Sequence, residues 1–242
     1  MKRKQKQHIP HPSQAGFTLI ESLVAIIVVA VLLTAMAPVM VLSTATRMQS
    51  KRVERGVEAS KAYMNALQSR AIPAPAHTVQ VAGEYTPPAT PGEKGQFQSK
   101  RGNFASVSAP SSGDFTCTTP GANGYCKNLP TASLYCFDID GIAGCDSTSK
   151  SDLIVQAARS TTVANGSDDS NKGYLMMVRV YRADALRNGG SLKTQKDLEG
   201  KKQATATAGM GARLLPLVEM TTEIRPLTPD YQDFCDRMSC KQ

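Results

Sequence analysis

The sequence predicts an α+β protein in which one long N-terminal helix packs on a small antiparallel β-sheet with disulfide-bounded loops. The helix is indicated by an apolar run over residues 17–42, which passes into a stretch with helical periodicity. The sheet is indicated by strand-like segments that begin only after residue 130. Six Cys, all far downstream of the apolar run, indicate disulfides and an oxidising compartment.

Composition divides the chain into five segments. They are a cleaved basic leader (1–16), a transmembrane and assembly helix (17–42), an amphipathic continuation of this helix (43–71), a connecting loop rich in Pro, Gly and Ser (72–130), and an antiparallel β-sheet domain with a C-terminal Cys loop (131–242).

The leader carries only basic charges, which predicts a cytoplasmic N-terminus. A secretory signal places its small-residue cleavage site after the apolar stretch. Here Ala15 and Gly16 precede that stretch, so a cut after Gly16 removes the leader and keeps the hydrophobic segment. The cut lowers the formal net charge from +8 to +4, because 24 Lys and Arg then face 20 Asp and Glu.

A helix over residues 17–42 is about 39 Å long and spans a bilayer core of roughly 30 Å with some tilt. Glu21 places a carboxylate inside this run, where it needs a partner. The free amine at Phe17 of a neighbouring copy would neutralise it. The alternative is a single-pass signal anchor whose Glu21 reaches the membrane interface. Pro38 removes one helical hydrogen bond, and the sequence leaves open whether it only kinks the helix or lets the helix extend in a filament.

The helix is expected to continue beyond the membrane run as an amphipathic one. Its apolar positions have helical spacing: Val53, Val57, Met64 and Leu67. Gly56 weakens it by about 1 kcal/mol relative to Ala, and the Pro residues after Ala71 end it. Four basic residues also follow the membrane run: Arg47, Lys51, Arg52 and Arg55. They meet acidic lipid or a partner subunit, or they form a solvated helix face, which we favour.

The segment 72–130 contains a strong breaker cluster at residues 87–92 and one short strand candidate at 79–81. Four strands are predicted later, and they form an antiparallel sheet packed on the helix: 134–137, 153–157, 174–181 and 214–224. The last is interrupted or offset at Pro216. We expect residues 188–211 to be an exposed loop.

Six cysteines allow 15 pairings. Local spacing favours three of them: Cys117–Cys126, Cys136–Cys145 and Cys235–Cys240. Zinc is disfavoured, because no C-x-x-C spacing occurs and His77 is the single histidine after the leader.

Asp138 and Asp140 have the spacing of the start of a calcium loop, and Asp146 and Asp152 would contribute from a different loop geometry. The glutamate of an EF-hand is missing. A polar turn whose Asp side chains cap backbone amides explains the same residues and is favoured.

No nucleotide-binding or hydrolase motif occurs, so the sequence predicts neither an enzyme nor, apart from calcium, a cofactor. The basic runs 100–101 and 193–202 contact polysaccharide, DNA or membrane phosphates, or are solvated loops, which we favour; no nucleic-acid partner is expected.

The stretch Gly16-Phe17-Thr18-Leu19-Ile20-Glu21 resembles the class III signal of type IV pilins and of the pseudopilins of type II secretion systems. The resemblance implies a pilin-like fold and a prepilin peptidase that cuts after Gly16 and methylates the new amine at Phe17. It also implies that Glu21 recruits the subunit into a filament, and Pro38 fits the family. It gives calcium some support, since major pseudopilins bind it. More narrowly, residues 20–70 and 174–184 resemble cyanobacterial pseudopilins of hormogonium polysaccharide secretion.

The resemblance implies a structural subunit of a type IV pilus or pseudopilus that acts in secretion, including polysaccharide secretion, or motility. The bulky loops and the disulfides predict a minor subunit rather than the repetitive major one. The implied partners are the prepilin peptidase, other pilin or pseudopilin subunits, an inner-membrane assembly platform and membrane lipid. The implied location is the inner membrane, single-pass, with the C-terminal domain in the periplasm. Two alternatives stay open: a pilus-tip binding module for DNA or surface ligands, and a plain signal-anchored exported protein.

Overall fold

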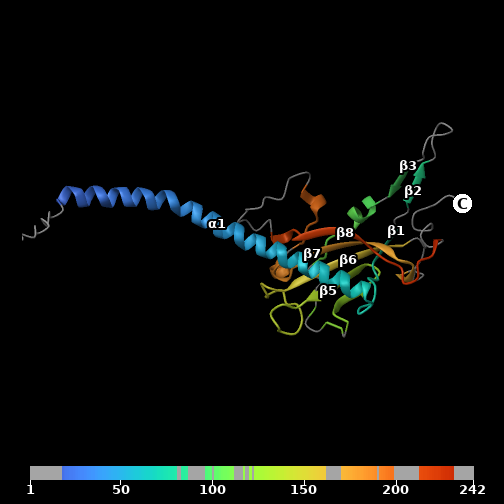
Figure 1. The fold of residues 1–242 in the computed structure, drawn as a ribbon. Coiled ribbons are helices and arrows are strands. Elements are labelled where there is room, and N and C mark those ends of the chain that lie inside the picture. The colour runs from blue at the N-terminus through green and yellow to red at the C-terminus, as the bar shows by residue number, and fades with distance from the viewer. Residues whose placement is uncertain are drawn as a thin grey trace, which may run out of the picture. The chain divides into compact units, whose positions relative to one another are not determined.

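The computed structural model describes residues 18–80, 83–86, 96–99, 101–111, 117, 120–121, 123–161, 170–189, 191–198 and 213–231. The chain separates into two compact units, Met1–Ala45 and Thr46–Gln242. Helix α1 (Leu19–Gln68) begins in the first unit and ends in the second (Figure 1). The second unit also holds the strands.

The second unit is built on a six-stranded sheet with the order β4-β5-β6-β7-β8, in which β1 also pairs with β6. These strands are β1 (Thr78–Gln80), β4 (Tyr125–Leu129), β5 (Ala132–Phe137), β6 (Leu153–Thr161), β7 (Tyr174–Arg182) and β8 (Val218–Ile224). A separate antiparallel pair joins β2 (Gly83–Thr86) to β3 (Gln96–Ser99). Short 3-10 helices are η1 (Arg101–Ser106), η3 (Ser170–Lys172), η4 (Ala183–Gly189) and η5 (Gln195–Leu198).

The C-terminal part of α1 packs along one face of this sheet (Figure 1). Successive side chains of a strand point to opposite faces, so alternate residues of β6 and β7 meet the helix. The helix contributes small and aromatic side chains, and the strands contribute mostly β-branched ones: Ala59, Tyr63 and Leu67 against Val155, Ala157, Met176, Val178, Val180 and Ile224. The predicted α+β arrangement, a long apolar helix on a largely antiparallel sheet, is confirmed.

The opposite face of the sheet is buried as well. Ile154 and Tyr181 pack there with residues of η4 and with Leu192, and Met177 packs with Phe104 and Val107. Both faces of the central strands are therefore covered, which explains why eight consecutive residues of β6 are buried.

Helix α1 ends at Gln68, three residues before the predicted end at Ala71, and a left-handed residue follows it. Arg70 has a φ of 60°, and the Ala71 N–H donates to the carbonyl of Ala66 at 2.9 Å. This is the Schellman pattern, in which Gly is the usual left-handed residue. The guanidinium of Arg70 donates to Asn171 Oδ1 at 3.2 Å.

The four predicted strands are present as β5, β6, β7 and β8, but the sheet has six strands, because the predicted connecting loop also contains strands. β4 lies at its C-terminal end, where a bulge between Tyr125 and Lys127 interrupts the alternation that would have marked it. β1, close to the short strand candidate at 79–81, pairs with β6 in parallel, so the sheet is not wholly antiparallel. η1 and the β2–β3 pair also lie in this segment.

Two further boundaries needed correction. β8 begins at Val218 rather than at residue 214, because Pro216 cannot donate to the ladder; the first bond to β7 runs from the Leu217 N–H to the Val180 carbonyl at 2.8 Å. The expected exposed loop at 188–211 is partly packed, since Leu192 and Thr194 are buried. Residues 190 and 199–211 of this loop lie outside the described part of the chain.

Candidate functional site

The N-terminal part of α1 presents a continuous apolar surface. Its most apolar window has a mean hydropathy of 2.8, and none of that window is buried within the molecule. The large side chains are at least half exposed, Leu33 by 63% and Val41 by 69%. A helix of this length and composition can cross a membrane, and exposed apolar area of this extent needs a lipid or protein cover.

Helix α1 begins with a capping interaction that involves the backbone of Glu21. The Glu21 N–H donates to the Thr18 hydroxyl at 3.3 Å and to the Thr18 carbonyl at 3.0 Å. Thr18 is therefore the N-cap and Glu21 is the third helical residue, the spacing of a capping box. A carboxylate in the first turn also interacts favourably with the helix dipole. The Thr-x-x-Glu signature before an apolar run could have revealed this second role of Glu21 from the sequence.

Two hydroxyl groups within the apolar part of α1 donate to carbonyls of the same helix. The Thr34 hydroxyl donates to the Ala30 carbonyl at 2.7 Å, and the Ser22 hydroxyl donates to the Leu19 carbonyl at 2.9 Å. The helix continues through Pro38, which has no N–H to offer the Thr34 carbonyl. The proposed roles of Pro38 in a filament and of Glu21 in recruitment stay predictions.

Four predicted site residues lie outside the described part of the chain. They are the processing pair Gly16 and Phe17 and the C-terminal pair Cys235 and Cys240. The cut, the methylation and the third disulfide therefore stay predictions.

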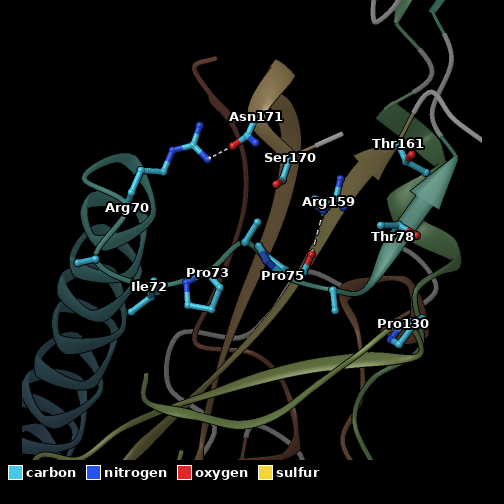
Figure 2. A pocket seen from close by; sticks show the side chains of 13 residues that line it. Arg70, Ile72, Pro73, Pro75, Thr78, Pro130, Arg159, Thr161, Ser170 and Asn171 are labelled. Atoms are coloured by element: carbon cyan, nitrogen blue, oxygen red, sulfur yellow. Dashed lines mark hydrogen bonds between the residues drawn. The ribbon is translucent and has the colours of Figure 1, made fainter. Parts of the chain in front are cut away.

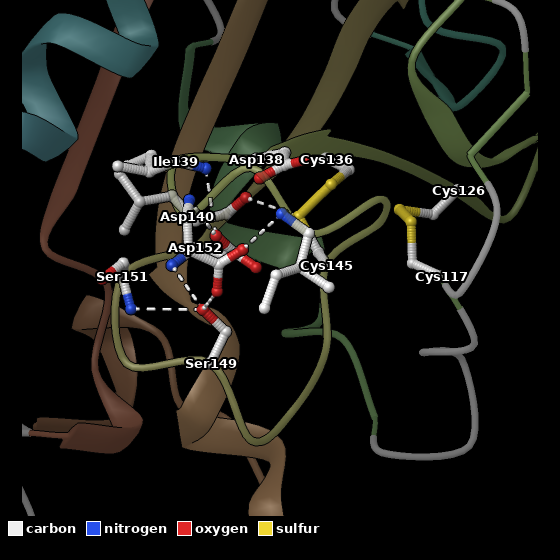
Figure 3. Close-up of a disulfide and its surroundings, with 12 residues drawn as sticks. Cys117, Cys126, Cys136, Asp138, Ile139, Asp140, Cys145, Ser149, Ser151 and Asp152 are labelled. Atoms are coloured by element: carbon white, nitrogen blue, oxygen red, sulfur yellow. Dashed lines mark hydrogen bonds between the residues drawn. A yellow bond between two sulfur atoms is a disulfide. The ribbon is translucent and has the colours of Figure 1, made fainter.

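Two disulfides join the loops beside β4 and β5. Cys117 is bonded to Cys126, and Cys136 is bonded to Cys145 (Figure 3). These are two of the three pairs that local spacing favours. Cys117, Cys136 and Cys145 form a buried cluster against which the partly buried Cys126 packs, and the Cys145 N–H donates to the Cys117 carbonyl at 2.9 Å. The bridges tie the edge of the sheet to its loops and occupy the sulfur atoms that a metal would need.

Three aspartates come together in the loop between β5 and β6 (Figure 3). Carboxylate oxygens of Asp138, Asp140 and Asp152 lie within 4.8 Å of one another. Each accepts from the backbone: Asp152 Oδ1 from the Ile139 N–H at 3.0 Å, Asp138 from Gly141 at 2.9 Å and Asp140 from Ile142 at 2.9 Å. The favoured capped turn accounts for these bonds, and calcium at Asp138 and Asp140 stays an untested prediction.

Asp146 does not join this cluster. It accepts from the backbone and the hydroxyl of Thr148, and these bonds lower the pKa of its carboxyl.

A pocket of about 650 Å³ lies between the end of α1 and β1 (Figure 2). Two arginines line it, and both hold the connection between helix and sheet. Arg70 donates to Asn171, and Arg159 donates through Nε to the Pro75 carbonyl at 3.0 Å. The guanidinium carbon of Arg159 also lies 5.7 Å from the centre of the Tyr174 ring. Among the residues that the structure describes, the lining of this pocket contains no Asp, Glu, His or Cys.

His77 also has a structural position. Its backbone N–H donates to the Ser133 hydroxyl at 2.9 Å, and its carbonyl accepts from the Arg159 N–H at 2.9 Å. Burial lowers the pKa of its imidazole, so the ring is neutral at pH 7. These bonds fix β1 beside β5 and β6.

Residues 11–37 match the prokaryotic N-terminal methylation motif. No curated protein and no solved structure matches the chain. The motif supports a type IV pilin-like class III signal and hence processing by a prepilin peptidase. Together with the exposed apolar part of α1 it also supports membrane anchoring and a structural rather than catalytic role. The match spans the end of the leader and most of the apolar run, and it does not extend to the folded unit.

Proposed function

We propose that this protein is a minor structural subunit of a type IV pilus or of a pseudopilus. The observation that carries the proposal is the methylation motif at residues 11–37, which leads directly into the fully exposed apolar part of α1. Cleavage after Gly16 would leave Phe17 with a free amine at the start of this helix. Copies of the helix can then bury their apolar surfaces against one another, with Glu21 paired to a neighbouring amine.

The folded unit supports a minor position. A repetitive subunit has to fit against copies of itself at every turn, whereas this unit carries two disulfide-bonded loops and several 3-10 segments beside its sheet. Such loops add bulk where a terminal subunit can accommodate it. The narrower resemblance, over residues 20–70 and 174–184, leads us to propose polysaccharide secretion or motility as the process served.

Two variants separate processing from assembly. Gly16→Val should block the cut and leave a chain that starts at Met1 when it is expressed with a prepilin peptidase. Glu21→Leu should be cut and methylated normally, and it should lose cross-links to neighbouring subunits. Ser22→Ala, one residue away, is the matched control and should be cut and cross-linked like the parent chain. Normal assembly of the Glu21→Leu variant would contradict the proposed pairing, and cutting of the Gly16→Val variant would contradict the proposed site.

A further inference from the structure

Three basic residues form a stripe along α1 just beyond its apolar part. Arg47, Lys51 and Arg55 are spaced four residues apart, so they lie on one side of the helix. All three are exposed. The residues of α1 that face the sheet begin at Gly56, one residue beyond the stripe: Gly56, Ala59, Ser60, Tyr63 and Leu67. Of the residues that the structure describes, none makes an ion pair with this basic stripe.

We propose that the basic stripe binds the phosphate groups of anionic phospholipids. The inference rests on membrane insertion of residues 17–42 and needs no filament. Arg47 follows the apolar run by five residues, a rise of about 7.5 Å in a helix. The headgroup layer of one leaflet is about 5–8 Å thick, so Arg47 lies at the depth of the phosphates.

The other two members lie farther out and reach back. Lys51 and Arg55 lie about 13.5 and 19.5 Å beyond the apolar run at the same rise per residue. Side chains on a helix lean toward its N-terminus, which here is the direction of the membrane. Lys51 can therefore approach the outer headgroups, whereas Arg55 acts across roughly one screening length, about 8 Å at physiological salt.

The order of charges along the helix favours lipid over a solvated face. From Leu42 to Val53 the charged residues are all basic, and the first acid, Glu54, comes after Arg47 and Lys51. A face adapted only to water gains from opposite charges four residues apart, whereas like charges at this spacing oppose the helix. Positive charge concentrated at the membrane-proximal end matches an anionic surface.

The test uses the complete processed chain in vesicles of phosphatidylcholine and phosphatidylglycerol. Spin-labelled forms of each lipid report the fraction immobilised at the protein, which gives the preference for the anionic lipid. Flotation with the vesicles measures membrane insertion separately. A chain that does not float would argue against membrane anchoring, whereas a chain that floats without preferring either lipid would argue against the lipid site.

We expect the parent chain to prefer phosphatidylglycerol and the triple variant Arg47→Gln, Lys51→Gln, Arg55→Gln to lose that preference. Each cation at the surface should raise the preference for phosphatidylglycerol by up to roughly fivefold. Among the single variants, the loss of this preference should be largest for Arg47, smaller for Lys51 and smallest for Arg55. The matched control Lys61→Gln, exposed and farther along α1, should keep the parent's preference, as should the charge-preserving Arg47→Lys with Arg55→Lys. Equal binding of both lipids by the parent would overturn the proposal. So would a triple variant that keeps its lipid preference and instead loses self-association, because the stripe would then serve a second copy of the chain.

Discussion

The hydroxyl of Tyr63 lies 2.7 Å from the hydroxyl of Tyr125, which joins helix α1 to strand β4. Tyr125 in turn donates to the Pro73 carbonyl at 3.0 Å, so the proton between the two phenols comes from Tyr63. Tyr135 completes the cluster through its ring, centred 5.2 Å from Tyr63 and 5.4 Å from Tyr125. This chain of bonds holds the helix, the segment that follows it and the edge strand together.

Tyr63→Phe should lower the free energy of unfolding by about 1 kcal/mol, because it removes one buried hydrogen bond. Tyr125→Phe should cost more, about 2 kcal/mol, because it also leaves the Pro73 carbonyl and the Tyr63 hydroxyl without their partner. Urea unfolding of the detergent-solubilised chain measures both. Tyr135→Phe is the control with little expected change, since its ring rather than its hydroxyl makes the described contacts. Equal losses in all three variants would show that the hydroxyl chain is not what stabilises this corner.

Stability should fall above about pH 10. Burial raises the pKa of Tyr63 well above its ordinary value, and burial likewise raises the pKa of Tyr125. Below the ordinary pKa of Tyr, about 10, both phenols are neutral in the folded and unfolded chain. As pH rises further the unfolded chain loses these protons first, so unfolding is favoured progressively. The double variant Tyr63→Phe, Tyr125→Phe should show a shallower loss between pH 9 and pH 11 than the parent, in the same unfolding assay; an unchanged slope would contradict this assignment.

Gly56 permits close contact between α1 and β8. A Cβ at this position would lie 3.2 Å from Leu217 Cβ and 3.2 Å from Val218 Cγ2. Gly56→Leu should therefore destabilise the folded unit by about 1–3 kcal/mol, as overpacking does. Ala62→Leu, at an exposed position of the same helix, should be tolerated. If the two variants unfold at the same urea concentration, the helix does not need this close approach.

Arg179 holds the segment after η1 against the sheet. Its side chain is 1% exposed, and it donates to Glu219 Oε1 at 3.0 Å and to the Val107 carbonyl at 2.6 Å. Arg179→Met should cost about 2–3 kcal/mol, because buried carbonyls lose their donor. It should also speed amide hydrogen exchange around residues 104–107. Glu219→Gln keeps an acceptor oxygen and should change amide exchange around residues 104–107 much less. Similar exchange in both variants would show that Arg179 does not hold this segment against the sheet.

The sequence predicts the parts of the fold that one residue pattern dominates. The apolar run, the helical spacing of Tyr63 and Leu67 and the β-branched stretch at 174–181 each leave one physical solution. β4 could not be recognised, because Cys126 sits in a bulge and carries a disulfide, so its alternation is broken. The packed segments around Phe104 and Leu192 also escaped prediction. Their burial depends on the second apolar face of the sheet, and only the assembled strands show that this face needs a cover.

More of the candidate site than of the surrounding fold could be predicted from the sequence. The Gly16–Glu21 stretch predicts the processing signal, and the motif match supports it. The capping bond from the Glu21 N–H to Thr18 was missed, although the Thr-x-x-Glu spacing was visible. The grouping of Asp152 with Asp138 and Asp140 depends on the conformation of the loop between β5 and β6, which spacing alone does not give.

The most direct test of the central claim is the N-terminus and intact mass of the chain purified from its own membranes. A pilin-type subunit should start at N-methylated Phe17 and be lighter by two hydrogen atoms for each disulfide. A chain that still begins at Met1, or one cut beyond the apolar run by an ordinary signal peptidase, would contradict a pilin-type subunit and leave the signal-anchored alternative.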